Sequence, residues 1–183
     1  MSEPICTVMV GLPGLGKSTL VEDQRKVYER IDMDLFVYST DGILERIAAF
    51  LGKTYDDVFK KHIKSATAEA DIDLAYAIKE RQDIIWDQTN LGAKKRAKII
   101  NRMRQAGYDV ECECIVPPES DYDGSKEDWV ERLANRPGKT IPDNILYNMM
   151  DSFVMPKVEE GFERVAFFNM YGALVSIEYN ETA

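Results

Sequence analysis

The chain has 183 residues, of which 45% are hydrophobic and 30% are charged. This composition suffices for one folded core, and the length predicts a single domain over residues 1–183 rather than two domains of equal size. The formal net charge of −9 argues against strong non-specific nucleic-acid binding, which needs an excess of lysine and arginine to neutralise phosphates.

The first four residues contain neither a basic segment nor a long apolar run. We therefore expect neither export nor membrane insertion, and a cytoplasmic location. The three cysteines, Cys6, Cys112 and Cys114, lack the C-x-x-C spacing of common metal sites. We expect reduced thiols in the core, with a zinc site or a disulfide as the alternatives.

The first part of the chain combines a strand pattern with a phosphate-binding motif. Apolar and β-branched residues predict a strand over residues 5–10, and helical spacing predicts a helix over residues 17–29. Between them, residues 11–18 match G-x-x-x-x-G-K-[ST] at every fixed position. In this motif glycines let the backbone wrap a triphosphate, the lysine reaches its β- and γ-phosphates, and the serine hydroxyl binds Mg²⁺. The nucleotide-binding residues expected here are Gly11, Leu12, Pro13, Gly14, Leu15, Gly16, Lys17, Ser18 and Thr19.

A second short strand is expected over residues 35–38, followed by a helix that stops at Gly52. Asp41 lies where this strand meets this helix. In a parallel sheet flanked by helices, ligands bind outside the carboxyl ends of the strands, so Asp41 is expected beside the phosphate-binding loop. Asp41 is therefore a candidate catalytic base, and a plain helix N-cap is the alternative.

Residues 55–81 contain neither proline nor glycine and predict one long helix or two bent ones. The apolar strand that follows, residues 83–86, ends in Asp87. An aspartate delivered by a buried strand beside a phosphate-binding loop is typical of a Walker B position, where the carboxylate holds Mg²⁺ directly or through water. We expect Asp87 and Ser18 as metal ligands, and a simple turn residue is the alternative for Asp87.

A basic helix is expected over residues 93–105, before a strand over residues 108–116. Its basic residues are Lys94, Lys95, Arg96, Lys98, Arg102 and Arg104. Lys94, Lys98 and Arg102 share one face of this helix, because they follow one another at intervals of four residues. A solvated face is the first interpretation, and a track for a polynucleotide is the alternative.

Residues 119–141 are expected to form a lid subdomain. An acidic loop leads to a helix that carries Arg132 and Arg136, which lie four residues apart and therefore on one helical face. Pro137 places the second arginine near the end of this helix. Guanidinium groups bind phosphoryl oxygens in bidentate pairs, which is what a lid over a triphosphate requires.

A helix after Pro142 and a closing pair of strands, over residues 164–168 and 173–179, complete the chain. Together the elements predict an α/β fold of the P-loop kinase type. We expect a mainly parallel sheet of five strands in the order 2-3-1-4-5, flanked by helices and carrying the helical lid.

Four sequence blocks, in this order, resemble the phage polynucleotide kinase family of P-loop kinases. The blocks are residues 11–19, 39–41, 87–91 and 132–136 with 141–142. The resemblance implies a 5′-hydroxyl kinase in which Asp41 takes the proton of the acceptor. It also implies that Lys17 and Ser18 contact the triphosphate and the metal, and that Arg132 and Arg136 act from the lid. One position departs from the family: Leu44 stands where its well-studied members carry an arginine three residues after the base.

The favoured function is ATP- and Mg²⁺-dependent transfer of the γ-phosphate to a hydroxyl, above all the 5′-hydroxyl of a polynucleotide. The loose transition state of this reaction needs positioning rather than a Ser, His or Cys nucleophile. A nucleoside, a hydroxymethylated base in DNA or another small molecule remains the alternative acceptor. A nucleotide-hydrolysing switch or ATPase, with Gln88 positioning water, and a catalytically silent binding module are the alternatives from other classes.

Overall fold

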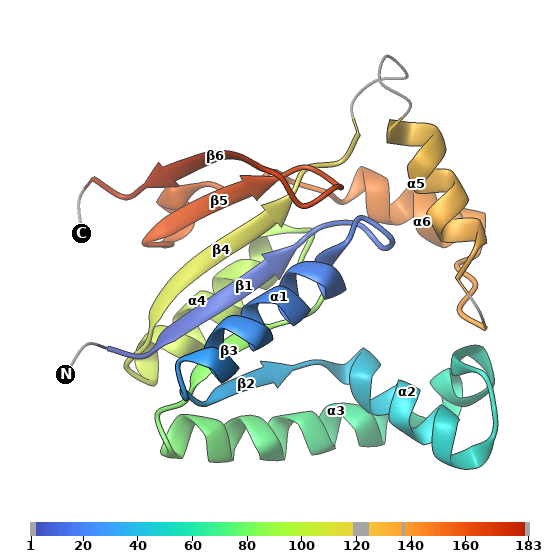
Figure 1. Cartoon of the computed structure of the whole chain (residues 1–183), viewed down its shortest axis with the longest axis horizontal. Coiled ribbons are helices and arrows are strands. Elements are labelled where there is room, and N and C mark those ends of the chain that lie inside the picture. The colour runs from blue at the N-terminus through green and yellow to red at the C-terminus, as the bar shows by residue number, and fades with distance from the viewer. Residues whose placement is uncertain (1–2, 119–124, 137, 182–183) are drawn as a thin grey trace.

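The computed structural model describes residues 3–118, 125–136 and 138–181, and in these ranges one mixed sheet carries the fold (Figure 1). Its strands are β1 Ile5–Val10, β2 Leu35–Tyr38, β3 Asp83–Trp86, β4 Asp109–Ile115, β5 Arg164–Phe168 and β6 Leu174–Tyr179. They are arranged in the order β2-β3-β1-β4-β5-β6. The first five run parallel and β6 runs antiparallel to β5. The predicted order 2-3-1-4-5 is therefore confirmed for the parallel strands.

The prediction of five strands is wrong by one, because β6 joins the same sheet. The chain reverses between β5 and β6 in a tight turn, where the Asn169 amide donates to the Ala173 carbonyl at 2.9 Å. Gly172 in this turn has a φ of 84°. So short a connection can join only antiparallel neighbours, since a parallel partner needs a long crossover.

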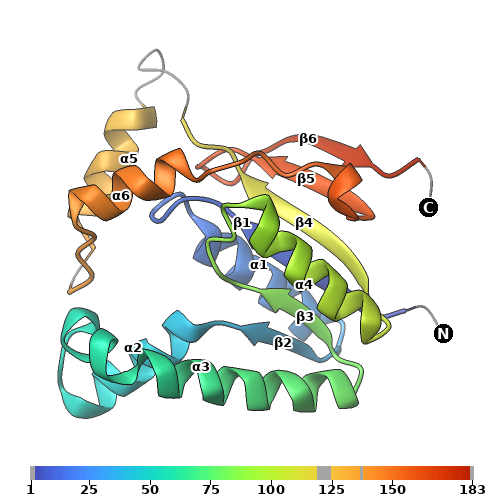
Figure 2. The same cartoon turned by 180° about the vertical axis from the view of Figure 1, so that it is seen from behind.

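Helices cover both faces of the sheet (Figures 1 and 2). They are α1 Lys17–Arg30, α2 Thr40–Leu51, α3 Tyr55–Lys79, α4 Ala93–Gln105, α5 Ser125–Ala134 and α6 Asp143–Asp151, with a short 3₁₀ turn at Val158–Glu160. The two views place α1 and α4 on opposite faces of the sheet, while α5 and α6 lie beyond the carboxyl end of β1. The segment predicted as one or two helices is the single helix α3, which begins with a capping box between Thr54 and Asp57.

The alternation of side chains along the strands divides the core into layers. On β1, Cys6, Val8 and Val10 belong to the cluster that also holds buried residues of α3 and α4, whereas Met9 packs with Val21 of α1. A strand buried on both faces reads as a nearly continuous apolar run, as β1 does. The three cysteines are free thiols and all are buried, as predicted.

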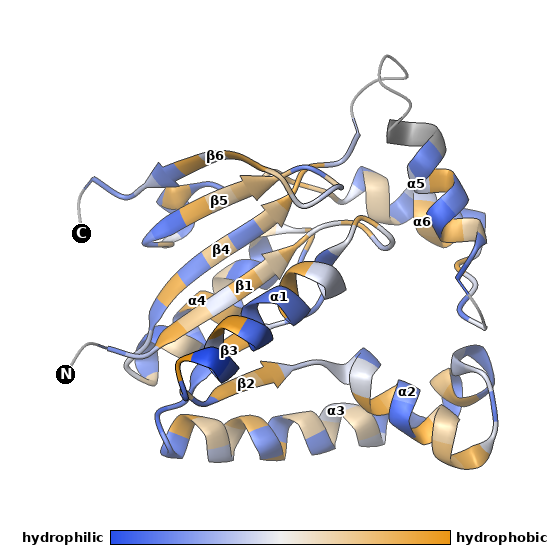
Figure 3. Cartoon of the chain, in the orientation of Figure 1, coloured by the Kyte–Doolittle hydropathy of each residue, from blue (hydrophilic) through white to orange (hydrophobic). Residues whose placement is uncertain are grey.

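β4 alternates hydrophobic with hydrophilic residues, as its colours show in Figure 3. Its hydrophilic side chains Glu111 and Glu113 bind Arg164 at 2.6 Å and Gln24 at 2.6 Å. One face of this strand therefore carries polar side chains, which bind to β5 through an ion pair and to α1 through a hydrogen bond. No helix in the described ranges is both long enough and apolar enough to cross a membrane.

The basic residues of α4 serve two different purposes. Lys94, Lys95 and Lys98 are exposed, in agreement with a solvated face. Arg96 is fully buried, and Arg102 and Arg104 form ion pairs with Asp71 of α3 and with Glu163 just before β5. The face predicted to be solvated, that of Lys94, Lys98 and Arg102, is exposed, whereas Arg96 lies outside this face and is buried.

Candidate active site

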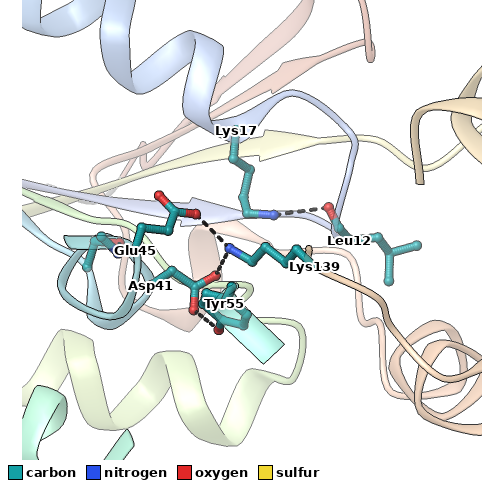
Figure 4. A network of polar contacts seen from close by, with 8 residues as sticks. Leu12, Lys17, Asp41, Glu45, Tyr55 and Lys139 are labelled. Atoms are coloured by element: carbon teal, nitrogen blue, oxygen red, sulfur yellow. Dashed lines mark hydrogen bonds and ion pairs between the residues drawn. The ribbon is translucent and has the colours of Figure 1, made fainter. Parts of the chain in front are cut away.

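The phosphate-binding loop follows β1 and leads directly into α1. Gly14 and Gly16 have φ values of 79° and 106°, in the left-handed region where only glycine is unstrained. The Lys17 ammonium folds back over the loop and donates to the carbonyls of Gly11 at 2.8 Å and Leu12 at 3.0 Å (Figure 4). α1 begins at Lys17 without a side-chain cap. Such an uncapped helix start is suited to an anion.

Charged groups from distant parts of the chain act on Lys17. Burial lowers the pKa of Lys17 to about 8. The nearby carboxylates of Asp87 and Asp41 oppose this shift, whereas the cations Arg136 and Lys139 add to it. All four charges are therefore close enough to influence the protonation of Lys17.

Asp41 is free for a role other than capping. Ser39 is the N-cap of α2 and accepts from the Gly42 amide at 3.2 Å, so the capping alternative for Asp41 is wrong. The two oxygens of Asp41 are held separately: Oδ1 accepts from the Tyr55 hydroxyl at 2.7 Å and Oδ2 from the Lys139 ammonium at 2.8 Å (Figure 4).

The Asp41 carboxyl is ionised at neutral pH. Burial alone would raise its pKa, but the hydrogen bond and the charge of Lys139 outweigh burial, and Tyr55 and Arg136 act in the same direction. The net result is a pKa below the usual value of an aspartate. A carboxylate in this state can accept a proton.

Asp87 follows β3, and its amide donates to the Tyr38 carbonyl of β2 at 2.9 Å. Burial raises the pKa of its carboxyl, although the Lys17 charge acts in the opposite direction. Among the described residues the carboxylate has no hydrogen-bond or ion-pair partner. It lies beside the loop that ends in Lys17 and the exposed Ser18.

The Asp87 carboxylate and the Ser18 hydroxyl are oxygen donors that fit Mg²⁺. The described residues contain no group of three or more His, Cys, Asp or Glu that could hold a metal by themselves. Mg²⁺ bound with a nucleotide needs no such group, because one or two protein oxygens suffice beside phosphates and water. An unpartnered carboxylate and a serine hydroxyl supply oxygens of this kind.

Asn90 fastens the phosphate-binding loop to the end of β3. Its amide nitrogen donates to the Met9 carbonyl at 2.8 Å and to the Trp86 carbonyl at 3.3 Å. The neighbouring Thr89 carbonyl accepts from the Gly11 amide at 3.1 Å. Asn90 has a φ of 48°, which asparagine tolerates better than most residues. The only sequence signal of this role is an asparagine shortly after a buried strand.

Helix α5, which belongs to the expected lid, packs directly on the phosphate-binding loop. The Trp129 indole donates to the Pro13 carbonyl at 2.8 Å. A methyl group added at Gly14 would lie 3.0 Å from the Leu133 side chain, so this glycine allows the close approach of α5. Residues 119–124 and Pro137 of the expected lid lie outside the described residues.

The two arginines expected in the lid have different surroundings, and the prediction that one helix carries both is wrong, because α5 ends at Ala134 and Arg136 lies beyond it. Arg136 acts electrostatically on Lys17 and Asp41, so it lies with the other charged groups. Arg132 donates to the Met170 carbonyl at 2.8 Å, and its guanidinium lies 5.4 Å from the centre of the Tyr171 ring. The structure therefore brings Arg136 to the site and holds Arg132 at the turn between β5 and β6.

Lys139, Tyr55 and Glu45 complete the surroundings of Asp41, and none of them follows from a sequence motif. The Lys139 ammonium contacts Glu45 at 3.0 Å and lies 4.2 Å from the centre of the Tyr55 ring. The sequence carries one weak signal, because Glu45 follows Asp41 by one helical turn. Lys139 comes from 98 residues away along the chain.

The site thus combines an anion-binding loop, an ionised carboxylate, oxygen donors suited to Mg²⁺ and an arginine at one edge of a parallel sheet. Such a combination defines a P-loop nucleotide-binding protein of kinase-like fold. The chain belongs to the AAA domain family, whose sequence profile matches residues 7–156.

A curated relative is the bifunctional polynucleotide phosphatase/kinase of Schizosaccharomyces pombe. It is 27% identical to this chain over 160 residues, which cover 86% of the chain and 32% of the relative. The chain therefore spans about a third of the length of that relative.

Two solved structures share the fold. A chain from the PezAT chromosomal toxin–antitoxin system of Streptococcus pneumoniae aligns with a TM-score of 0.59 and 16% identity, over 97% of this chain and 72% of its own length. A candidate kinase from Chloroflexus aurantiacus aligns with a TM-score of 0.60 and 15% identity, over 92% and 86%. At these identities the likeness concerns the fold.

Proposed function

We propose that the protein is an ATP-dependent phosphotransferase that moves the γ-phosphate of ATP to a hydroxyl, most favourably the 5′-hydroxyl of a polynucleotide. The observation that carries the proposal is a phosphate-binding loop ending in Lys17 whose charge is coupled to that of Asp41, a carboxylate held by hydrogen bonds from Tyr55 and Lys139. The name of the fission-yeast relative supports a polynucleotide as the acceptor class.

In the proposed reaction the acceptor hydroxyl donates a hydrogen bond to the Asp41 carboxylate. The hydroxyl oxygen attacks the γ-phosphorus, the bond to the β–γ bridging oxygen breaks, and the proton passes to Asp41 while ADP leaves. General-base assistance of this kind contributes about 10²- to 10⁴-fold in rate. The pair of hydrogen bonds from Tyr55 and Lys139 orients the carboxylate.

The cations of the site act on the phosphates. Lys17 and the amides of residues 11–19 bind the triphosphate, and Arg136 neutralises charge on the transferring phosphoryl group. Ser18 and Asp87 would hold Mg²⁺, which supplies neutralisation of the β- and γ-oxygens when it is bound. Arg132 and Arg136 both belong to the proposed lid, residues 119–141. Arg132 anchors α5 on the turn between β5 and β6, and this anchoring helps to hold Arg136, which follows α5, in place.

The acceptor class is tested with γ-labelled ATP, Mg²⁺ and a panel of hydroxyl acceptors. We expect label on DNA or RNA oligonucleotides with a free 5′-hydroxyl and none on the same oligonucleotides carrying a 5′-phosphate. Label found instead on a nucleoside, on a hydroxymethylated base in DNA or on another small molecule would replace the polynucleotide as acceptor. Release of inorganic phosphate at one rate with and without every acceptor would favour a nucleotide-hydrolysing switch.

A further inference from the structure

Lys139 is a largely buried cation that contacts Asp41, Glu45 and Tyr55. Its side chain is only 15% exposed. It bonds to the carboxylates of Asp41 and Glu45 and lies over the Tyr55 ring (Figure 4). A cation removed from water needs such partners, and three of them on one ammonium fix its position.

The backbone around Lys139 is fastened to the start of α3. The Gly138 carbonyl accepts from the Asp56 amide at 3.2 Å, and the Thr140 amide donates to Asp56 Oδ2 at 2.9 Å. A methyl group added at Gly138 would lie 2.9 Å from the Thr54 Cβ, so glycine permits the contact. We call residues 138–140 the strap. The strap joins the chain that follows α5 to the corner between α2 and α3.

Asp41 and Glu45 are like charges one turn apart on α2, an arrangement that is unfavourable on a helix. Lys139 lies between them and removes the repulsion. Without it, Tyr55 would hold one oxygen of Asp41, and the repulsion from Glu45 would favour other side-chain rotamers. The orientation of the carboxylate therefore depends on a residue that arrives with the strap.

We infer that Lys139 is a positioning residue for Asp41, and that the placement of the base depends on docking of the strap, residues 138–140, against the start of α3. This inference rests on the proposed function, because it assigns to Asp41 the part of the proton acceptor. Lys139 acts through Asp41: it fixes Oδ2 from one side while Tyr55 fixes Oδ1 from the other.

The charged and titratable groups that face Asp41 predict how loss of Lys139 changes its titration. They are Glu45 on α2, Tyr55 on α3, Arg136 and Lys139 in the lid segment, Lys17 on α1 and Asp87 after β3. When the Lys139 charge is removed, the carboxylates of Glu45 and Asp87 still act on Asp41, but of these cations only Lys17 and Arg136 remain. The pKa of Asp41 then rises, because its charged form is less favoured.

The test compares Lys139→Met, Lys139→Arg and Lys79→Met in the full chain. Lys79 is a matched control, since it is an exposed lysine at the other end of α3, about 36 Å along the helix from Tyr55. Transfer is measured against pH with the best acceptor of the panel. The Asp41 carboxylate is titrated by ¹³C NMR without nucleotide, Mg²⁺ or acceptor.

For Lys139→Met we expect kcat to fall roughly 10- to 100-fold, because one charge-assisted hydrogen bond to the base is lost. The ATP Kd should change less than kcat does, since Lys139 makes no hydrogen bond or ion pair with the described residues of the phosphate-binding loop and acts on Lys17 only through its charge. The acid limb of the pH–rate profile and the ¹³C titration of Asp41 should both move to higher pH. Lys139→Arg should restore most of the rate, and Lys79→Met should match the wild type.

An unchanged titration of Asp41 in Lys139→Met would overturn the inference, even if kcat fell, because Lys139 would then act on the fold rather than on the base. An unchanged kcat and pH profile in an active enzyme would overturn it as well. If the titration moves but the wild type phosphorylates no acceptor, the proposed function fails while the effect of Lys139 on the Asp41 carboxylate is supported.

Discussion

At the scale of single residues, Lys17 combines a partly buried side chain with a charge that phosphate binding requires. Burial lowers its pKa to about 8, so the nucleotide-free protein loses this proton at mildly alkaline pH. A triphosphate favours the protonated form, and binding above pH 8 must therefore take up a proton. The lysine that the motif identifies is thus also the residue that sets the pH dependence of nucleotide binding.

The prediction for Lys17 concerns the affinity for ATP. Because only the protonated form binds well, the ATP Kd should rise roughly tenfold between pH 7 and pH 9. Isothermal titration calorimetry at both pH values, in two buffers with different heats of ionisation, measures the affinity and the proton uptake together. Equal affinities at the two pH values, with no proton taken up at pH 9, would contradict this account of Lys17.

At the scale of elements, α5 carries only one of the two arginines that the sequence pairs, because the helix ends at Ala134 and Arg136 follows it. Helical spacing places Arg132 and Arg136 on one face, and the motif resemblance assigns both to the phosphates. In the structure Arg132 is held by Met170 and Tyr171, whereas Arg136 acts on Lys17 and Asp41. The spacing could not reveal this difference, because the turn between β5 and β6 approaches α5 only in the folded chain.

The two arginines should therefore respond differently to substitution. Arg136→Ala should lower kcat on the order of 10³-fold or more with little change in thermal stability, because it removes charge neutralisation from the transition state. Arg132→Ala should lower Tm and reduce kcat less, because it loosens α5. Steady-state kinetics and thermal unfolding of both variants provide the measurement. Equal losses of kcat at unchanged Tm would mean that both guanidiniums contact the phosphates.

Helix α4 carries a buried arginine, Arg96, that the sequence pattern did not predict. A run of basic residues predicts a solvated face, yet Arg96 is 0% exposed and bonds to Glu160 at 2.6 Å and 2.8 Å. Arg96 also donates to the carbonyls of Asn90 and Leu91 at 3.1 Å and 2.8 Å. Its partner Glu160 lies 64 residues away, so local patterning carried no sign of this ion pair.

The Arg96 contacts lead to a prediction about stability. Arg96→Met should lower the free energy of unfolding by about 3 kcal/mol, since it leaves a partly buried carboxylate and two carbonyls without their donor. Urea unfolding measures this change, and Lys98→Met, at an exposed position of the same helix, is the control. A loss no larger than that of the control would show that the ion pair adds nothing to the fold.

At the scale of the whole molecule, rules of local pattern predicted the helices and strands, whereas the order of the parallel strands was expected from the P-loop kinase type of fold and not from the pattern. Motif spacing identified Lys17 and Ser18, and the rule that ligands bind at the carboxyl ends of parallel strands placed Asp41 and Asp87 at the same edge. Lys139 could not be predicted, because its contacts with Asp41 depend on a strap that crosses from one side of the site to the other. The sixth strand was missed as part of the sheet for a related reason, since pairing partners are not encoded in the strand itself.

The central claim is that groups from distant segments act on one transferring phosphoryl group, with Asp41 as the proton acceptor. The most direct test is a single-turnover experiment on Asp41→Asn with γ-labelled ATP, Mg²⁺ and a 5′-hydroxyl oligonucleotide, beside an equilibrium measurement of ATP binding. We predict an ATP Kd within about twofold of the wild type and a transfer rate lower by about 10²- to 10⁴-fold. A transfer rate equal to that of the wild type, with ATP fully bound, would contradict the claim.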